Sequence, residues 1–317
     1  MTTDNNTLQA ARSNKDDEYY TRLEYIEAEV GHYWKHFEGQ TVFLNCGDDP
    51  TRNFWKYFHE NFRAIGLKKL TATTYVPGGH GKLFTYDGVE TVETELSGNG
   101  DFRSKECIRI LDSSDIVVSN PPFSLFRDYL KQILAHGKKF LIVGSMNAAT
   151  CKEVFRSIME NRVWWGCSTS GSARNMWFDC EDDYEPDNAN NNYKVEDGVK
   201  MRKIQGIEWY TNLEHKKRNV PLELVCQYNP DDYPEYDNYR AIEVSRVARI
   251  PYDYDGVMGV PVSFLDKHCP SQFEIVGMTE NSDIVSHLYI DGCEKYDRPY
   301  LGGKRLYSRI LIRRRRQ

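Results

Sequence analysis

Between residues 41 and 166, short apolar segments alternate with amphipathic ones, and this alternation constrains the fold more than any other feature of the chain. It predicts parallel strands joined by crossover helices. We therefore expect an α/β fold, a doubly wound, mostly parallel sheet with ligand sites at the carboxyl ends of its strands. The predicted strands are 41–45, 70–76, 115–119, 140–143 and 163–166, and the predicted helices are 53–65, 123–135 and 151–160.

The regions on either side differ in texture. Residues 16–37 carry apolar side chains at every third or fourth position, which predicts one amphipathic helix. Residues 77–99 are polar and rich in glycine, so we expect a loop or an exposed hairpin. Beyond residue 180 only short strand-like segments recur, which favours an irregular α+β lobe. These segments are 207–210, 222–226, 241–244 and 273–276.

These differences divide the chain into three predicted parts. A polar, flexible arm is expected at residues 1–15, a domain built on the sheet at 16–180, and the second lobe at 181–317. The chain carries a net charge of −6, but this value hides a basic C-terminus. The segment 304–317 has seven basic residues and no acidic one, which predicts a basic tail.

The composition argues against several classes of protein. No apolar run approaches the roughly 18 residues that span a bilayer, and the polar N-terminus lacks the apolar core of a secretory signal. The eight cysteines form no C-x-x-C pair, so we expect no zinc or other metal site and no disulfide framework. Scattered single cysteines are typical of the reducing cytoplasm, where we expect the protein to act.

The tetrapeptide Asn120-Pro121-Pro122-Phe123 directly follows the predicted strand 115–119 and precedes a helix. The Asn120 side-chain oxygen and the Pro121 carbonyl are acceptors for the two N–H groups of an adenine amino group. The prolines stiffen the loop and remove donors, and Phe123 offers a flat face for an extruded base. This loop predicts methylation of an amino nitrogen through positioning and electrostatics. The alternative is a Pro-Pro turn with Phe123 in the core.

Further segments extend over nearly the whole chain. They are DEYYT (17–21), LNCGDDP (44–50), NFWKYF (53–58), GLKKL (66–70), GNGDFRS (98–104), SDIVVSNPPFSLFRDYL (114–130), KKFLIVG (138–144), YDNYRAIEV (236–244) and IPYDYDGVMGVPVSFLDK (250–267). In these segments and their order the chain resembles the EcoRI-type adenine-specific DNA methyltransferases. The resemblance implies methyl transfer from S-adenosylmethionine to N6 of adenine in DNA. It also implies a cofactor domain at 16–180 and a DNA-recognition region at 181–317.

The resemblance further implies which residues form the site. Tyr20 and Thr21 are expected at the methionine end of the cofactor, and Asp101 and Phe102 at its adenine. The loop after the first strand is expected beneath the cofactor, and the tetrapeptide is the implied catalytic loop. The loop comprises Asn45, Cys46, Gly47 and Asp48, and the tetrapeptide Asn120, Pro121, Pro122 and Phe123.

Two features depart from the wider methyltransferase pattern. Gly47 is the only glycine after the first strand, and the second strand ends without a carboxylate for the ribose. Asp48 or Asp49 is expected to take the ribose role, or the ribose is held differently. Structural roles compete with the others, with Tyr20 in a core and Asp48 or Asp101 as a helix cap.

A duplex substrate requires phosphate contacts and rotation of the target base out of the helix. Two basic clusters are candidates for the phosphate contacts, with solvated surface charge as the alternative. They are Lys216, Lys217 and Arg218, and the run Arg313, Arg314, Arg315 and Arg316. We expect double-stranded DNA as the partner of a monomeric enzyme, with a functionally paired restriction endonuclease that forms no stable complex with it.

Two alternatives stay open at this point. Asn-Pro-Pro-aromatic loops also serve amino methylation of RNA and methylation of a protein glutamine. The unusual turn after the first strand would also suit a DNA-binding homologue that has lost cofactor affinity. The large second lobe favours DNA over RNA or protein, and an intact tetrapeptide favours an enzyme.

Overall fold

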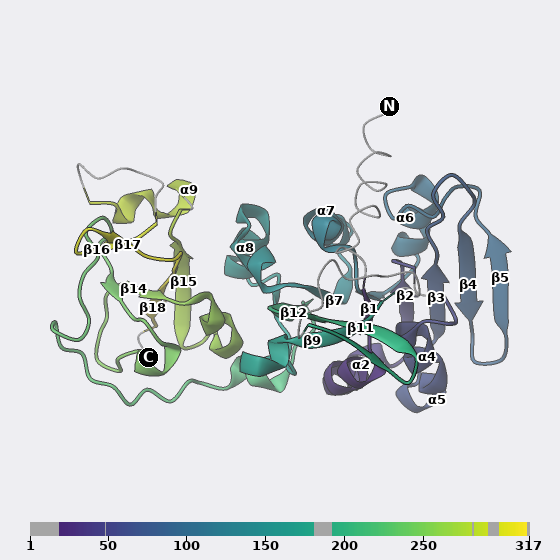
Figure 1. The fold of residues 1–317 in the computed structure, drawn as a ribbon, viewed down its shortest axis with the longest axis horizontal. Helices are drawn as coiled ribbons and strands as arrows, with labels where there is room; N and C mark the ends of the chain where they lie inside the picture. The colour runs from purple at the N-terminus through teal and green to yellow at the C-terminus, as the bar shows by residue number, and fades with distance from the viewer. Residues whose placement is uncertain (1–18, 48, 181–191, 281, 291–297, 316–317) are drawn as a thin grey trace. The chain divides into compact units, whose positions relative to one another are not determined.

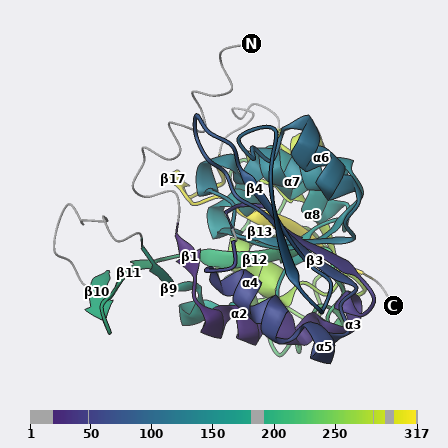
Figure 2. The same cartoon turned by 90° about the vertical axis from the view of Figure 1, so that its right-hand side faces the viewer.

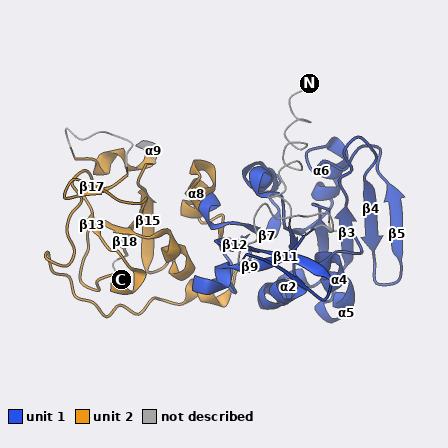
Figure 3. Cartoon of the chain, in the orientation of Figure 1, with its two compact units in different colours: residues 1–148, 165–213 blue, residues 149–164, 214–317 orange. Residues whose placement is uncertain are grey.

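The computed structural model describes residues 19–47, 49–180, 192–280, 282–290 and 298–315. They form two compact units, Met1–Ala148 with Trp165–Leu213 and Ala149–Trp164 with Glu214–Gln317 (Figure 3). The division does not fall at residue 180, where the composition changes. The strand at Ile207–Thr211 pairs with the one at Lys139–Ser145, and this pairing belongs to the first unit.

An eight-stranded sheet, in the order β5-β4-β3-β2-β6-β7-β12-β8, is the centre of the first unit (Figure 1). The neighbours β3, β2, β6 and β7 are parallel, whereas β4, β5 and β12 pair antiparallel. A mostly parallel α/β centre is therefore confirmed. The strands are β2 (Thr41–Leu44), β3 (Lys69–Thr73), β4 (Lys82–Tyr86), β5 (Thr91–Glu95), β6 (Ile116–Ser119), β7 (Lys139–Ser145), β8 (Trp164–Trp165) and β12 (Ile207–Thr211).

Helices cover both faces of this sheet, with α6 and α7 on one face and α2, α4 and α5 on the other (Figures 1 and 2). All four residues of β2 and all four of β6 are buried, as expected for strands covered on both sides. The helices are α2 (Leu23–Val30), α3 (Trp34–Phe37), α4 (Asn53–Glu60), α5 (Phe62–Ile65), α6 (Lys105–Asp112) and α7 (Phe126–Ala135), with 3-10 turns η1 (Gly31–Tyr33), η2 (Phe123–Leu125), η3 (Met146–Thr150) and η4 (Gly171–Arg174).

A second, four-stranded sheet corrects the expectation of one helix over residues 16–37. Tyr20 and Thr21 form strand β1 and pair antiparallel with Asp179 and Phe178. The first helix begins only at Leu23, because this long-range pairing overrides the local helical spacing. The sheet has the order β1-β9-β11-β10. Its strands are β1 (Tyr20–Thr21), β9 (Met176–Asp179), β10 (Tyr193–Glu196) and β11 (Val199–Ile204).

Of the two expectations for residues 77–99, the hairpin is confirmed, because β4 and β5 pair antiparallel. None of the helices among the described residues has the length and apolar character needed to cross a membrane.

The second unit contains a four-stranded sheet in the order β13-β14-β18-β15 and a two-stranded one, β16-β17. The predicted strand at 222–226 is absent from the described residues, where Cys226 forms only an isolated bridge with Pro251. The elements are α8 (Lys152–Met159), α9 (Ser282–Val285), β13 (Ile242–Glu243), β14 (Met258–Val260), β15 (Phe273–Met278), β16 (Tyr300–Leu301), β17 (Lys304–Arg305) and β18 (Ile310–Arg314), with the 3-10 turns η5 (Lys216–Asn219), η6 (Val247–Arg249), η7 (Val262–Lys267) and η8 (Ser286–Leu288).

The segment GVMGVP, at residues 256–261, owes its glycine at 259 to packing. Gly259 lies in β14, and a Cβ atom there would come within 2.1 Å of the Tyr236 hydroxyl oxygen. Tyr236 is 1% exposed and so cannot move aside without opening the core of the second unit. The segment therefore has a structural role in this unit.

Candidate functional site

A cavity of about 600 Å³ lies in the first unit, where β2 and β6 end. The chain runs from β2 to β3 on one side of β2, whereas β6 lies on the other side. Such a reversal of strand order opens a crevice at the carboxyl ends, which is the usual ligand site in a doubly wound sheet. The cavity is also within the volume range of sites for small organic ligands.

The cavity brings together most of the residues that the sequence singled out. The predicted residues that line it are Tyr20, Thr21, Asn45, Cys46, Gly47, Asp101, Phe102, Asn120 and Pro122. Asp48 lies outside the described residues. Pro121 and Phe123 do not line the cavity: Pro121 is buried, and Phe123 is half-buried and packs against the main apolar core of this unit.

The side chain of Asn120 has a fixed orientation. Its Nδ2 donates a hydrogen bond of 2.6 Å to the carbonyl oxygen of Tyr19. A carbonyl oxygen only accepts, so the amide nitrogen must face Tyr19 and Oδ1 must lie on the other side of the group. Asn120 therefore presents an acceptor at the end of β6, as the predicted chemistry requires.

The loop after β2 is held by contacts with neighbouring elements. The side chain of Asn45 is buried, and its Oδ1 accepts a short hydrogen bond from the hydroxyl of Tyr129 in α7. Gly47 has φ +82°, a conformation that disfavours any residue with a Cβ atom. Its N–H donates to the carbonyl oxygen of Thr73, at the end of β3, over 3.2 Å. The single glycine thus suffices for this turn.

Strand β1 forms one wall of the cavity, and sequence reasoning had placed it in a helix. Two asparagines hold its backbone: Asn120 bonds the carbonyl of Tyr19, and Asn53 Nδ2 bonds that of Thr21 over 3.0 Å. The Thr21 side chain is 2% exposed, and its Oγ1 has no hydrogen-bond partner among the described residues. A buried hydroxyl without a partner is costly unless a ligand satisfies it.

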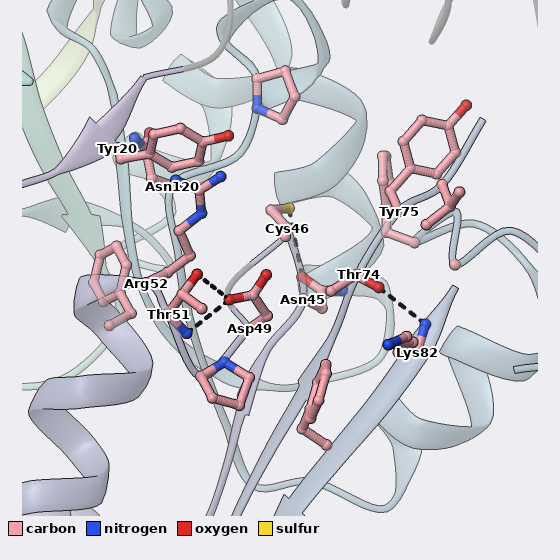
Figure 4. Close-up of a pocket in the computed structure, with 18 of the residues that line it drawn as sticks. Tyr20, Asn45, Cys46, Asp49, Thr51, Arg52, Thr74, Tyr75, Lys82 and Asn120 are labelled. Carbon is pink, nitrogen blue, oxygen red and sulfur yellow. Dashed lines mark hydrogen bonds between the residues drawn. The ribbon is translucent and has the colours of Figure 1, made fainter. Parts of the chain in front are cut away.

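Arg52 extends this wall, although no sequence motif singles it out. Its guanidinium carbon lies 3.4 Å from the centroid of the Tyr20 ring, so the two groups are stacked (Figure 4). The side chain lines the cavity, and its buried Nε has no hydrogen-bond partner among the described residues. We call Thr21, Arg52 and Asn120 the β1 side of the cavity.

The charges on the opposite side of the cavity are paired. Lys82 in β4 lies 2.7 Å from Glu93 in β5, and this contact raises the pKa of Lys82. Figure 4 shows Lys82 beside Thr74, across the cavity from Tyr20 and Asn120. The hairpin β4–β5 supplies both charges, and the sequence pattern did not reveal that it borders the site.

Asp101 and Phe102 complete the lining. The Asp101 carboxylate forms an ion pair of 3.0 Å with Arg103 and accepts from the Arg103 N–H over 2.8 Å. The cap of α6 is Ser104, whose side chain accepts from the N–H of Cys107, so Asp101 does not fill that structural role. Phe102 is buried and packs edge-on against Tyr129.

Asp49 takes a local structural role at this site. Its Oδ1 accepts from the backbone N–H and the hydroxyl of Thr51, over 2.8 and 2.5 Å. Asp49 lines the cavity, and its other carboxylate oxygen takes no part in these two bonds. A role for Asp49 in binding the ribose therefore stays a prediction. The described residues contain no group of His, Cys, Asp or Glu side chains that could hold a metal ion.

Residues 310–314 of the basic C-terminal segment form a strand and not a solvated tail, which corrects the expectation for this part of the chain. Arg313 and Arg314 belong to β18, whose Ile310, Leu311 and Ile312 are buried between β14 and β15. The apolar residues that precede the basic run provide the core contacts that order it. Arg314 lies 3.3 Å from Asp255, and Arg315 Nε donates to the carbonyl of Pro270. Arg313 and Arg315 are exposed, and Arg316 is outside the described residues.

The three residues of the other basic cluster, 216–218, differ in their exposure and contacts. Lys216 is exposed and Lys217 half-buried in η5. The side chain of Arg218 is 10% exposed, bonded to Glu214 over 2.7 Å and stacked on Trp164 at 3.8 Å. Burial lowers its pKa. Arg218 therefore has structural contacts in the second unit, and a phosphate role fits Lys216 and Lys217 better.

The known proteins to which this chain is similar are all methyltransferases. The family model described as "Adenine-specific methyltransferase EcoRI" matches residues 7–315. The type II methyltransferase M.EcoRI of Escherichia coli is 39% identical, over 95% of this chain and 98% of the relative. M.MpnI, a type II methyltransferase of Mycoplasma pneumoniae, is 38% identical over 96% of this chain and 97% of its own. M.MgeORF184P of Mycoplasma genitalium is 36% identical over 96% and 97%. No solved structure matches the chain.

Proposed function

This chain belongs to the EcoRI family of adenine-specific DNA methyltransferases, and on that premise we propose that it transfers a methyl group from S-adenosylmethionine to N6 of an adenine rotated out of double-stranded DNA. The observation that carries the proposal is the orientation of Asn120. Its amide nitrogen is taken by Tyr19, so its oxygen is available at the end of β6 to accept from an amino group.

The cavity suits S-adenosylmethionine. It lies at the strand ends where such ligands bind, and two of its buried polar atoms, Thr21 Oγ1 and Arg52 Nε, have no protein partner among the described residues. Phe102 and Asp101 offer an apolar ring and a carboxylate for the adenine of the cofactor. Asn45 and Gly47 form the floor, where α7 holds the side chain of Asn45 and β3 holds the backbone of Gly47.

The tetrapeptide acts on the target base. Asn120 Oδ1 and the Pro121 carbonyl accept from the adenine amino group, which concentrates electron density on its nitrogen and orients its lone pair. When bound, the cofactor supplies an electrophilic methyl group: the adenine nitrogen gains the carbon as the carbon–sulfur bond breaks, and one amino proton is then released. No strong general base is needed, because that proton becomes acidic once the nitrogen is methylated. In this proposal, the part of the half-buried Phe123 ring that the core leaves uncovered stacks on the base.

The rest of the chain serves the DNA. We assign DNA recognition to the region after residue 180 and phosphate contacts to Lys216, Lys217, Arg313 and Arg315. The protein acts as a monomer, since one chain carries both catalytic and recognition regions. A restriction endonuclease of the same specificity is its functional counterpart, without a stable complex between the two.

Methyl incorporation tests the proposal directly. The purified protein is incubated with labelled S-adenosylmethionine and, in parallel, duplex DNA, an RNA of the same sequence and a glutamine-containing protein. We expect incorporation into duplex DNA alone, and digestion to nucleosides should place the label in N6-methyladenine. Label in RNA or protein instead, or no binding of S-adenosylmethionine by calorimetry, would favour one of the alternative functions. Modification-sensitive sequencing of DNA from cells that express the protein then gives the base and its context.

A further inference from the structure

We propose that Arg52 binds the α-carboxylate of S-adenosylmethionine, with the hydroxyl of Thr21 as the second donor. This inference rests on the proposed function, because it assumes that this cofactor occupies the cavity. It assigns a role to a residue that the sequence motifs did not single out.

The first support is the state of the guanidinium. Its face is stacked on the Tyr20 ring, at 3.4 Å from the centroid. Stacking uses the face of the planar group and leaves its N–H donors pointing outward in the plane. One of these, on the buried Nε, has no partner among the described residues. Arg52 is thus a cation on the cavity wall that the Tyr20 ring holds in place and that keeps one N–H donor without a partner among the described residues.

The second support comes from the carboxylates that surround the two cations of the cavity wall, as far as the described residues show them. Within the described residues, the other cation that lines the cavity, Lys82, has Glu93 at 2.7 Å. Arg52 forms no ion pair with a described carboxylate. Asp49 accepts from Thr51, and Asp179 has Arg22 at 3.5 Å. Burial raises the pKa of Asp179, and the charges of Arg22 and, more weakly, of Arg52 oppose this rise. The wall therefore has a site for an anion.

The third support is a hydroxyl group on a second residue that lines the cavity. Thr21 Oγ1 is buried, lines the same cavity and has no partner among the described residues. A guanidinium and a hydroxyl together offer the donors that a carboxylate accepts most strongly. The α-carboxylate is the only anionic group of S-adenosylmethionine, whose sulfonium and ammonium are both cationic. The geometry therefore predicts which end of the cofactor lies against β1.

The test compares two ligands by isothermal titration calorimetry: S-adenosylmethionine and its decarboxylated analogue. We expect the unaltered protein to bind S-adenosylmethionine about 10- to 100-fold more tightly, the range for charge-assisted hydrogen bonds. Arg52→Gln should remove most of this preference by weakening S-adenosylmethionine while leaving the analogue nearly unchanged. Lys82→Gln is the matched control, a cation on the cavity wall that already has a carboxylate partner, and should keep the preference.

The outcomes separate this inference from the proposed function. Equal binding of both ligands by the unaltered protein overturns the role of Arg52 and leaves the proposed function standing. Equal weakening of both ligands by Arg52→Gln also overturns it, because that result indicates that Arg52 only supports the Tyr20 ring. Weakened DNA binding with unchanged cofactor affinity assigns Arg52 to a phosphate instead. If the unaltered protein binds neither ligand, the proposed function fails, and this inference fails with it.

Discussion

The β1 side of the cavity and the Tyr236–Glu243–Arg309 cluster of the second unit both consist of buried and half-buried polar residues, but they differ in how far their polar atoms are satisfied. In the cluster, Glu243 accepts from Arg309 at 2.8 and 3.1 Å and from the Tyr236 hydroxyl. On the β1 side, Thr21 Oγ1 and Arg52 Nε have no partner among the described residues. Polar groups that are paired within the protein stabilise the fold, whereas unpaired ones on residues that line a cavity are candidates for contact with a ligand.

The first prediction tests the β1 side through the reaction rate. Asn120→Ala removes the acceptor for the adenine amino group and should lower the single-turnover rate of methylation by about 100-fold or more, as for other lost acceptors or donors at a reacting centre. Affinity for S-adenosylmethionine should change little. Rapid-quench measurement with labelled cofactor gives the rate, and calorimetry gives the affinity.

Asn53→Ala is the matched control for this prediction. Asn53 also lines the cavity and also holds the β1 backbone through its amide nitrogen. If Asn120 acted only by holding Tyr19, both variants would lose a similar share of the rate. We expect a loss of less than about tenfold for Asn53→Ala, since one neutral hydrogen bond contributes roughly 1 kcal/mol.

The second prediction tests the satisfied cluster through stability. Glu243→Gln removes the charge beside Arg309 while keeping the shape of the side chain, and it should lower the free energy of unfolding by about 2–4 kcal/mol because a largely enclosed guanidinium, 13% exposed, loses its counter-ion. Glu274→Gln, at an exposed position of β15, should cost less than about 0.5 kcal/mol. Urea denaturation measures both, and equal costs would contradict the distinction between the two regions.

The third prediction concerns Thr21. Thr21→Val replaces an unsatisfied hydroxyl by a methyl group of similar size, so the free protein should be as stable as before or more stable, and affinity for S-adenosylmethionine should fall by about 5- to 10-fold. Thermal melting without ligand and calorimetry with ligand separate the two effects. A large loss of stability with unchanged affinity would mean that the hydroxyl serves the fold.

The smallest expected effect concerns Arg313, near the end of the chain. Arg313 is exposed, whereas Arg309 in the same part of the chain is bonded to Glu243. Arg313→Gln should reduce the slope of log affinity for DNA against log salt by about one, the share of one phosphate contact. Lys105→Gln, on the exposed start of α6, should leave this slope unchanged. An unchanged slope for Arg313→Gln would remove Arg313 from the DNA contacts.

The sequence predicted the centre of the fold and the position of the cavity. Apolar segments such as 115–119 are continuous because the strands are covered on both faces, and Asn120 follows such a strand directly. Strand β1 could not be predicted, because its two residues depend on pairing with Phe178 and Asp179, far along the chain. Arg52 was missed for a similar reason: stacking on Tyr20 and its orphaned Nε are properties of the assembled wall.

At the basic C-terminus, the row of charged residues predicted a tail, whereas residues 310–314 form a strand. A row of arginines resembles a solvated tail, but Ile310 and Ile312 already have a place in the core. A run of charged residues does not prevent strand formation when a few adjacent apolar residues can pack in the core and complete a sheet. Truncation there would therefore test folding and not DNA binding, which is why single substitutions are the better experiment.

The two-residue strand β1 is shared between the cavity wall and the small sheet that it forms with β9, β11 and β10. A change of register in β9 would displace the Thr21 backbone, even though Phe178 does not line the cavity. The small sheet thus helps to position this wall of the cavity. Mutational screens for altered cofactor use should find substitutions along β9 and β11 as well as around the tetrapeptide.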